Sequence, residues 1–102
     1  MSYQTLIVEK KDGVATVILN RPERLNALNN AMQRELLDAI ADIRDDDSVA
    51  VMILTGAGRA FSAGRDLKET EAGAPRHDPI GPGGPWKALE DMGKPVIAAV
   101  NG

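Results

Sequence analysis

The run Val49-Ala50-Val51-Met52-Ile53-Leu54 is apolar at every position, and Gly56-Ala57-Gly58 ends the regular structure after it. A strand that is apolar on both faces is typical of a parallel sheet covered by helices. A second run of this kind, Val96-Ile97-Ala98-Ala99-Val100, lies near the other end of the chain. We therefore expect an α/β fold in which residues 49–54 and 96–100 are buried strands.

The residues before this run predict a β-hairpin. Two β-rich runs, residues 6–8 and 14–19, lie on either side of the pair Asp12-Gly13. An Asp-Gly pair favours a tight hairpin turn because glycine readily adopts the positive φ that such turns need.

A helix is predicted between the hairpin and the strand. Its apolar residues recur at helical spacing and form one face: Met32, Leu36, Leu37, Ile40 and Ile43. Asn30 is the predicted N-cap, with Gln33 three residues later as in a capping box. Acidic residues oppose the helix dipole at a C-terminus, so the run that begins at Asp45 places the helix end near Arg44. The predicted order is ββαβ.

Composition excludes several classes of function. The 102 residues form one domain or part of one, and 43% of them are apolar. The net charge of −3 provides no basic field for nucleic acid. The absence of cysteine excludes a disulfide scaffold and a thiolate metal site, and it fits a cytoplasmic protein. No apolar run approaches the ~20 residues of a membrane helix, and the N-terminus lacks a signal-peptide pattern.

The second half of the chain contains a segment rich in glycine and proline. Residues 72–85 are predicted to form a mobile surface loop, and a short helix is expected over residues 86–92. The strand at residues 96–100 is followed only by Asn101-Gly102, so nothing remains to cover both of its faces. We expect residues 1–102 to be the N-terminal part of one domain, apparently truncated.

The best candidate for chemistry is the stretch Ser62 to Lys68, which follows the strand at residues 49–54. Its small residues let a ligand approach the backbone, and a turn that enters a helix leaves amide N–H groups unpaired. Such groups favour negative charge and stabilise an oxyanion. This chemistry uses the backbone, so a side chain as large as Arg65 is tolerated. The alternative is a plain Gly-rich turn; a nucleotide-binding loop is disfavoured because no Gly-Lys-Ser/Thr follows Gly56.

Three separated segments together resemble the crotonase family of enoyl-CoA hydratases and isomerases. They are Arg21-Pro22-Glu23-Arg24-Leu25-Asn26-Ala27-Leu28, Gly58-Arg59-Ala60-Phe61-Ser62-Ala63-Gly64-Arg65-Asp66-Leu67-Lys68 and Lys94-Pro95-Val96-Ile97-Ala98-Ala99-Val100-Asn101-Gly102. The resemblance implies the N-terminal part of a crotonase-like spiral of ββα units. It also implies an enzyme of fatty-acid or related acyl-CoA metabolism that holds a thioester enolate in an oxyanion hole. The family commonly forms trimers and hexamers, so a homo-oligomer follows by resemblance.

The resemblance also assigns roles to individual residues. The backbone N–H of Arg65 becomes the first oxyanion-hole donor. The adenine and thioester end of the coenzyme A site is lined by Ala63, Gly64, Arg65, Asp66, Leu67 and Lys68. The pantetheine and phosphate path is lined by Arg24, Leu25 and Ala27. Lys68 and Arg24 either meet CoA phosphates or are solvated surface cations, and Asn26 is expected to fix its loop rather than touch substrate.

The remaining catalytic groups fall outside this sequence. By resemblance, the second N–H donor and the catalytic glutamates lie beyond Gly102, as do residues that decide among hydration, isomerisation, hydrolysis and C–C cleavage. Glu69, Glu71 and Glu90 are the nearest alternatives as general acid or base, and we interpret them as solvated carboxylates. His77 is interpreted as a surface residue, with no metal site and no cofactor other than the CoA of the substrate.

Trp86 either walls the acyl pocket or anchors its helix. Two other functions stay open beside the enzyme: a catalytically inactive CoA-binding fragment, and an interaction module. In the interaction module, the uncovered strand at residues 96–100 pairs with another chain.

Overall fold

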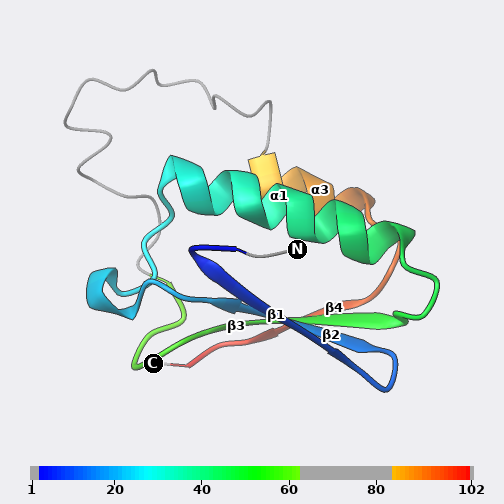
Figure 1. Cartoon of the computed structure of the whole chain (residues 1–102), viewed down its shortest axis with the longest axis horizontal. Coiled ribbons are helices and arrows are strands. Elements are labelled where there is room, and N and C mark those ends of the chain that lie inside the picture. Colours follow the sequence, from blue (N-terminus) through cyan, green and yellow to red (C-terminus); the bar gives the residue numbers. More distant parts are fainter. Residues whose placement is uncertain (1–2, 63–83, 102) are drawn as a thin grey trace.

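The computed structural model describes residues 3–62 and 84–101, which form a sheet with helices on one face (Figure 1). The strands are β1 (Leu6–Lys11), β2 (Val14–Leu19), β3 (Val51–Gly56) and β4 (Val96–Ala99). The helices are the 3-10 turn η1 (Pro22–Arg24), α1 (Asn30–Asp45) and α3 (Gly84–Asp91). The predicted α/β class and the ββαβ order of the first half are confirmed.

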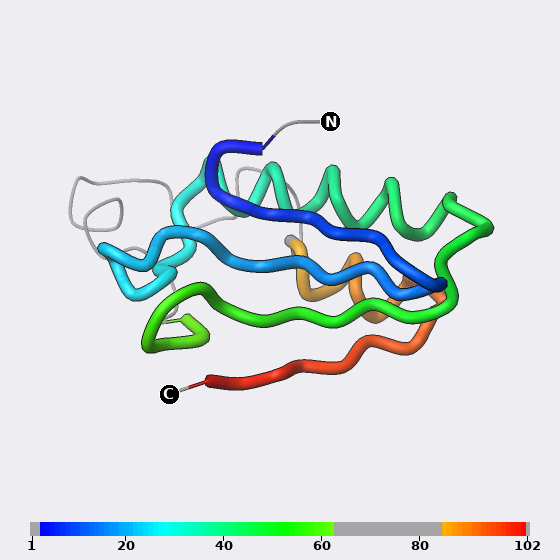
Figure 2. The backbone as a smooth tube through the Cα atoms, turned by 60° about the horizontal axis from the view of Figure 1, so that its bottom comes forward, coloured from blue at the N-terminus to red at the C-terminus, as the bar shows by residue number. Residues whose placement is uncertain are grey.

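The four strands are ordered β1-β2-β3-β4, as Figure 2 shows. β1 and β2 are antiparallel, and β2, β3 and β4 run parallel to one another. The predicted hairpin is confirmed, because Asp12 and Gly13 form its two-residue turn with φ values of 53° and 81°. The carboxyl ends of β2, β3 and β4 meet at one edge of the sheet, where Leu19 pairs with Gly56 and Thr55 with Ala99.

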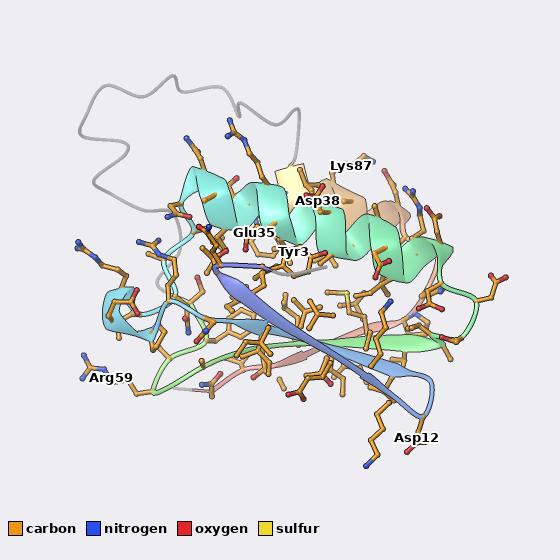
Figure 3. All side chains as sticks on the ribbon, viewed as in Figure 1. Tyr3, Asp12, Glu35, Asp38, Arg59 and Lys87 are labelled. Carbon is orange, nitrogen blue, oxygen red and sulfur yellow. The ribbon has the colours of Figure 1, made fainter. Side chains whose placement is uncertain are left out.

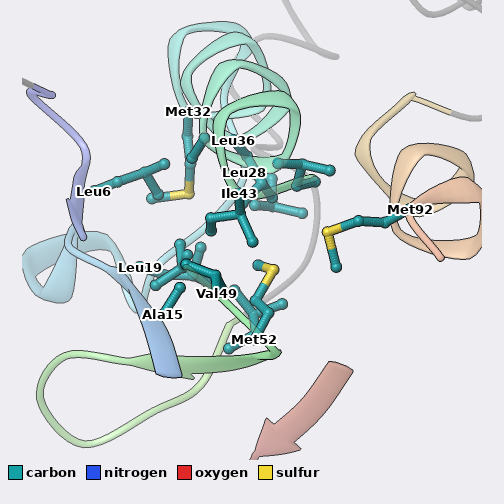
Figure 4. Close-up of a cluster of buried hydrophobic side chains, with 14 residues drawn as sticks. Leu6, Ala15, Leu19, Leu28, Met32, Leu36, Ile43, Val49, Met52 and Met92 are labelled. Atoms are coloured by element: carbon teal, nitrogen blue, oxygen red, sulfur yellow. The ribbon is translucent and has the colours of Figure 1, made fainter. Parts of the chain in front are cut away.

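The core lies between the sheet and the two helices (Figure 4). From α1 it receives Met32, Leu36, Ala39, Ile40 and Ile43, which confirms most of the predicted apolar face. Alternate residues of β2 and β3 face these side chains: Ala15, Val17, Leu19, Met52 and Leu54. Met92, just after α3, completes the layer. The buried hydrophobic side chains of the described residues are all aliphatic or methionine.

The N-cap of α1 is Asn29, so the prediction of Asn30 was wrong by one residue. Asn29 has an extended backbone, and its Oδ1 accepts a hydrogen bond of 2.8 Å from the N–H of Met32. Two consecutive asparagines offer the same cap chemistry, and only the backbone conformation decides between them.

At the other end, α1 reaches Asp45, one residue beyond the predicted end. The Nζ of Lys94 donates to the carbonyl oxygens of Ile43 and Asp46, each at 2.7 Å. This distant cation satisfies terminal carbonyls and offsets the acidic run there.

The prediction that residues 49–54 are buried on both faces was wrong for this chain, whereas the exposure of β4 agrees with the lack of cover expected for residues 96–100. β3 alternates between buried and half-buried residues, and in β4 three of four residues are exposed, with Ile97 at 55%. α1 and α3 cover one face of the sheet only (Figure 1). An apolar sequence indicates that both faces of a strand are normally packed against other elements, but it does not indicate whether residues 1–102 supply those elements.

The second half of the chain contains one helix, α3, and the strand β4 among its described residues after β3. α3 begins at Gly84, two residues before the helix expected at Trp86. The predicted loop at residues 72–85 lies almost entirely outside the described residues. Among the described helices, none has the length and apolar character that crossing a membrane requires.

Candidate active site

The carboxyl edge of the three parallel strands brings together the segments that follow them. Residues 20–29 follow β2, residues 57–62 follow β3, and Val100 and Asn101 follow β4. Each belongs to one of the three segments that carried the resemblance. In open sheets with parallel strands, ligands commonly bind outside this edge. The sequence therefore places its three motifs where the fold favours a site.

The first segment is a tight turn built on η1. Arg24 and Leu25 donate their backbone N–H groups to Arg21 and Pro22, and Asn26 donates back to Arg21 at 2.8 Å. Leu25 and Asn26 both lie in the left-handed region, with φ of 52° and 56°. Asparagine tolerates this conformation, but leucine is strained there at about 1–2 kcal/mol. A strained leucine implies that the surrounding contacts hold the turn in place.

Asn26 supplies the main contact between this turn and the next segment. Its side chain is fully buried at 0% exposure. Its Nδ2 donates to the carbonyl oxygens of Ala57 (2.9 Å) and Ala60 (2.8 Å), and its Oδ1 accepts from the N–H of Arg21 (2.7 Å). Because carbonyls only accept and a backbone N–H only donates, these partners fix the orientation of the amide. The expected role of Asn26 in fixing a loop agrees with these contacts.

The second segment leaves β3 and folds back upon it. A Cβ placed on Gly56 would lie 2.5 Å from the carbonyl oxygen of Ala60 and closer still to that of Phe61, so the position admits only glycine without a backbone shift. Ser62 then donates its hydroxyl to the carbonyl oxygen of Asn26 at 2.9 Å. The segment Gly56–Ser62, which we call the stem, is thereby joined to the turn before the chain continues to residue 63.

Asn101 joins the third segment to the same stem. Its Nδ2 donates to the carbonyl oxygens of Gly56 and Gly58, both at 2.9 Å, and its Oδ1 accepts from the N–H of Gly56 at 3.3 Å. Sequence reasoning missed this residue, because its partners lie 43 to 45 residues away. A polar residue directly after a strand at the carboxyl edge is the signal that was available.

Three of the residues expected to line a coenzyme A site lie in the described part of the chain. Arg24 is exposed on η1, whereas Leu25 and Ala27 are half-buried in the turn. The Ala27 carbonyl accepts a hydrogen bond of 2.6 Å from Arg21 Nη1, which tightens the turn. The remaining expected residues lie outside the described part of the chain: Ala63, Gly64, Arg65, Asp66, Leu67 and Lys68.

Other residues singled out earlier take simple positions or fall outside the described residues. Glu90 is exposed on α3, in agreement with a solvated carboxylate, and Trp86 is 46% exposed on the same helix. Glu69, Glu71 and His77 lie outside the described residues. Across residues 3–62 and 84–101, no cluster of His, Asp and Glu side chains has the arrangement of a metal site.

Exposed positive charge lies at the stem end of the molecule. Arg59 projects from the stem at the end opposite Asp12, which marks the tip of the hairpin (Figure 3). Arg59 and Arg24 are both exposed, and the stem approaches η1 closely, since a Cβ on Gly58 would lie 3.0 Å from the Cβ of Pro22. A surface hollow of about 290 Å³ lies elsewhere, lined by Tyr3, Val8, Lys10 and Asp42.

The sequence profile of the family described as enoyl-CoA hydratase/isomerase matches residues 9–102. The chain belongs to this family. The resemblance to the crotonase superfamily and the fold that it implied are therefore confirmed.

Individual proteins of the family are similar over nearly the whole chain. A hydroxycinnamoyl-CoA hydratase-lyase of Pseudomonas fluorescens is 41% identical over 98% of this chain and 39% of its own length. A probable enoyl-CoA hydratase of Mycobacterium tuberculosis is 39% identical over 100% of this chain and 40% of its own. The crystal structure of an enoyl-CoA hydratase from Mycobacterium marinum superimposes with a TM-score of 0.87 at 45% identity, over 97% of this chain and 49% of that one. The chain thus spans about 40% of the length of these curated relatives.

Proposed function

We propose that this chain is the acyl-CoA-binding part of a hydratase or isomerase that stabilises a thioester enolate with backbone N–H groups. The observation that carries the proposal is the convergence of the three motif segments on the stem Gly56–Ser62. Asn26, Ser62 and Asn101 join them with hydrogen bonds of 2.8–2.9 Å from side chain to backbone carbonyl. The relatives named above act on CoA thioesters, and the proposed substrate is of that class.

The proposed chemistry depends on the chain that leaves the stem. The N–H of Arg65, three residues beyond Ser62, is the proposed donor to the thioester oxygen. That oxygen gains negative charge as the enolate forms, so a donor aimed there beforehand lowers the barrier; removing one such donor typically costs ~2.7–4 kcal/mol. Ala63 to Lys68 would meet the adenine and thioester, and Arg24, Leu25 and Ala27 the pantetheine and phosphates.

The remaining parts of the active site are proposed to come from residues beyond Gly102. These are the second N–H donor and the carboxylates that handle water and the α-proton. A polypeptide of residues 1–102 alone is then expected to be slower by at least ~10²-fold for the missing donor and by a further ~10²–10⁴ for the acid and base. A cytoplasmic trimer or hexamer in fatty-acid or related metabolism, with no cofactor beyond the CoA of the substrate, completes the proposal.

Binding and turnover of acyl-CoA test this function. The complete gene product is incubated with crotonyl-CoA, and loss of the conjugated double bond is followed by absorbance, with binding of the saturated butyryl-CoA measured by calorimetry. We expect saturable binding and hydration. If neither ligand bound at about millimolar concentration, where the affinity is worth only ~4 kcal/mol, the proposal would be rejected.

A second candidate function is supported by the exposure of β4. Ile97 and Val100 are 55% and 70% exposed, and β4 is the last strand of the sheet. An exposed apolar edge strand is a template for pairing with another chain, as expected for an interaction module. Light scattering of the complete gene product tests this function, because a monodisperse monomer would count against it.

A further inference from the structure

Asn26 and Asn101 come from opposite halves of the chain and act on the same few peptide groups. Each side-chain amide uses both of its N–H donors on carbonyl oxygens of the stem. Asn26 binds those of Ala57 and Ala60, and Asn101 binds those of Gly56 and Gly58. Four of the first five carbonyls of the stem are therefore held by two side chains.

Holding a carbonyl also orients the next amide. A trans peptide is planar, so its N–H points opposite to its C=O. Carbonyls drawn toward Asn26 and Asn101 therefore turn the N–H groups of the following residues away from these side chains. This arrangement fixes the planes of four peptide groups of the stem.

We propose that Asn26 and Asn101 are positioning residues, which hold the stem in one geometry before the chain continues to Arg65, the proposed N–H donor. We call the four hydrogen bonds from Asn26 and Asn101 to the carbonyls of the stem the clamp. The effect of the clamp on catalysis rests on the proposed function, whereas the clamp itself is inferred from the hydrogen bonds alone. Neither residue is proposed to touch substrate. Both are expected to act on kcat through the backbone that they hold.

The burial of Asn26 argues against a role in packing alone. A fully buried amide gains nothing over an apolar side chain unless its donors and its acceptor are paired, and in Asn26 both N–H donors and Oδ1 have partners. Asn101 is only half-buried and follows the edge strand, so its removal leaves no core cavity. Substitution of Asn101 is therefore expected to disturb the geometry of the stem with little change in the global stability of the fold, which makes Asn101 the better position to test.

The test compares Asn101→Ala, Asn101→Asp and Asn26→Ala with Asn29→Ala in the complete gene product. Asn29 is the matched control: it is the same residue type, it caps α1, and its side chain accepts a hydrogen bond from the N–H of Met32. Asn101→Asp keeps the size and the acceptor but loses both donors. Each variant is assayed for melting temperature, for amide hydrogen exchange of residues 57–62, and for kcat and KM with crotonyl-CoA.

The expected result is local and catalytic. In the Asn101 and Asn26 variants, exchange in the stem accelerates by about tenfold or more, while α1 keeps its protection. At equal folded fraction kcat falls by about 10–10²-fold with KM nearly unchanged, because a small misplacement affects mainly the transition state. Asn29→Ala lowers the melting temperature but leaves stem exchange and kcat near wild type.

Two results would overturn the proposal. One is stem exchange that is unchanged in all three clamp variants; the other is a loss of kcat no larger than that of Asn29→Ala. Retention of kcat by Asn101→Asp would also reject the donor role. A wild-type protein without acyl-CoA activity would reject the proposed function instead, and stem exchange alone would then decide whether the clamp exists.

Discussion

Gly56 is the residue at which β3 must turn into the stem without room for a side chain. A Cβ there would meet backbone atoms of Ala60 and Phe61, which cannot move aside as a flexible side chain can. Gly56→Ala is therefore expected to lower the free energy of unfolding by about 1–3 kcal/mol, as overpacking does. Urea denaturation of the complete gene product measures this change.

Gly93 provides the control for this substitution. It has φ of 80° with nothing within 4 Å of an added Cβ, so its constraint is conformational rather than steric. Asparagine tolerates the left-handed region, and Gly93→Asn is expected to cost below about 1 kcal/mol. A Gly56→Ala cost no larger than that of Gly93→Asn would show that the stem can relax.

Arg65 tests whether the proposed oxyanion donor belongs to the backbone. Arg65→Pro removes the N–H and is expected to lower kcat by about 10²–10³-fold. Arg65→Ala keeps the N–H and is expected to stay within about tenfold of wild type, since the proposed role belongs to the backbone rather than to the side chain. Steady-state kinetics with crotonyl-CoA distinguish the two, and equal losses in both variants would assign the role to the guanidinium instead.

The sequence predicted the candidate site unevenly, and the reason is the distance between partners. The small residues after β3 were recognisable because their pattern is local, and the segment around Asn26 was indicated by its resemblance to the family. Asn101 was missed because only the parallel register, which pairs Thr55 with Ala99, brings it to Gly56. Single-residue roles that depend on such long-range register cannot be derived from spacing.

At the scale of the element, the C-terminus of α1 is stabilised by distant charges. Lys10 on β1 donates to Asp42 and Asp46, both at 2.7 Å, and Asp46 also accepts from the hydroxyl and N–H of Ser48. These hydrogen bonds, that from Lys10 first, hold the pKa of Asp46 well below its usual range. The carboxylate next to a helix C-terminus is thus compensated by cations that helix rules cannot foresee.

The depressed pKa of Asp46 predicts a pH dependence of stability. A carboxyl group with a lower pKa in the folded state contributes stability that is present above its unfolded pKa, near 3.9, and is lost as the pH falls below it toward the folded pKa. The free energy of unfolding is therefore expected to decline below about pH 4, and Asp46→Asn to flatten that decline. Urea titrations at several acidic pH values measure the slope.

Asp47→Asn is the matched control for the acid titration. Asp47 is exposed and adjacent to Asp46, and the same amide replaces the same carboxyl. We expect this variant to keep the wild-type slope. If both variants flattened the decline equally, a general loss of negative charge would explain it rather than the bonds to Lys10 and Ser48.

Among elements, the hairpin and the body of α1 could be predicted because their signals lie within a few residues. The Asp12-Gly13 turn and the apolar face of α1 are fixed by local conformation and period. The partial exposure of β3 could not be predicted, because apolar residues on both faces of a strand indicate that it is normally covered but not which residues cover it. The exposure of β4 could be predicted, because residues 101–102 are too few to cover it. The observed ends of β3 and β4 differ from the predicted ranges 49–54 and 96–100, because pairing with neighbouring strands rather than composition sets where a strand begins and ends.

At the scale of the whole molecule, the sheet carries two apolar faces but the helices cover one. The register places the following residues on the face opposite α1 and α3: Ile7, Val14, Ile18, Val51, Ile53 and Ile97. The same face also carries Glu9, Lys11, Thr16 and Thr55. Isolated exposed apolar residues are normal, but apolar residues that recur on one face across all four strands are more typical of a contact surface. The relatives are more than twice as long as this chain, so their additional residues are the natural source of cover.

Ile97→Lys tests this inference in the complete gene product. If the face stayed as exposed as the 55% seen for Ile97, the substitution would cost within about 0.5 kcal/mol, like most surface changes. We instead expect a loss of about 3 kcal/mol or more in the free energy of unfolding, because lysine would bury an unpaired charge. Ala31→Lys places the same side chain on the exposed face of α1 and is the control, expected within about 0.5 kcal/mol. If Ile97→Lys and Ala31→Lys lowered the free energy of unfolding by equally small amounts, the face of the sheet opposite α1 and α3 would be exposed to solvent in the complete protein. The apolar residues of that face would then serve to bind a separate partner molecule.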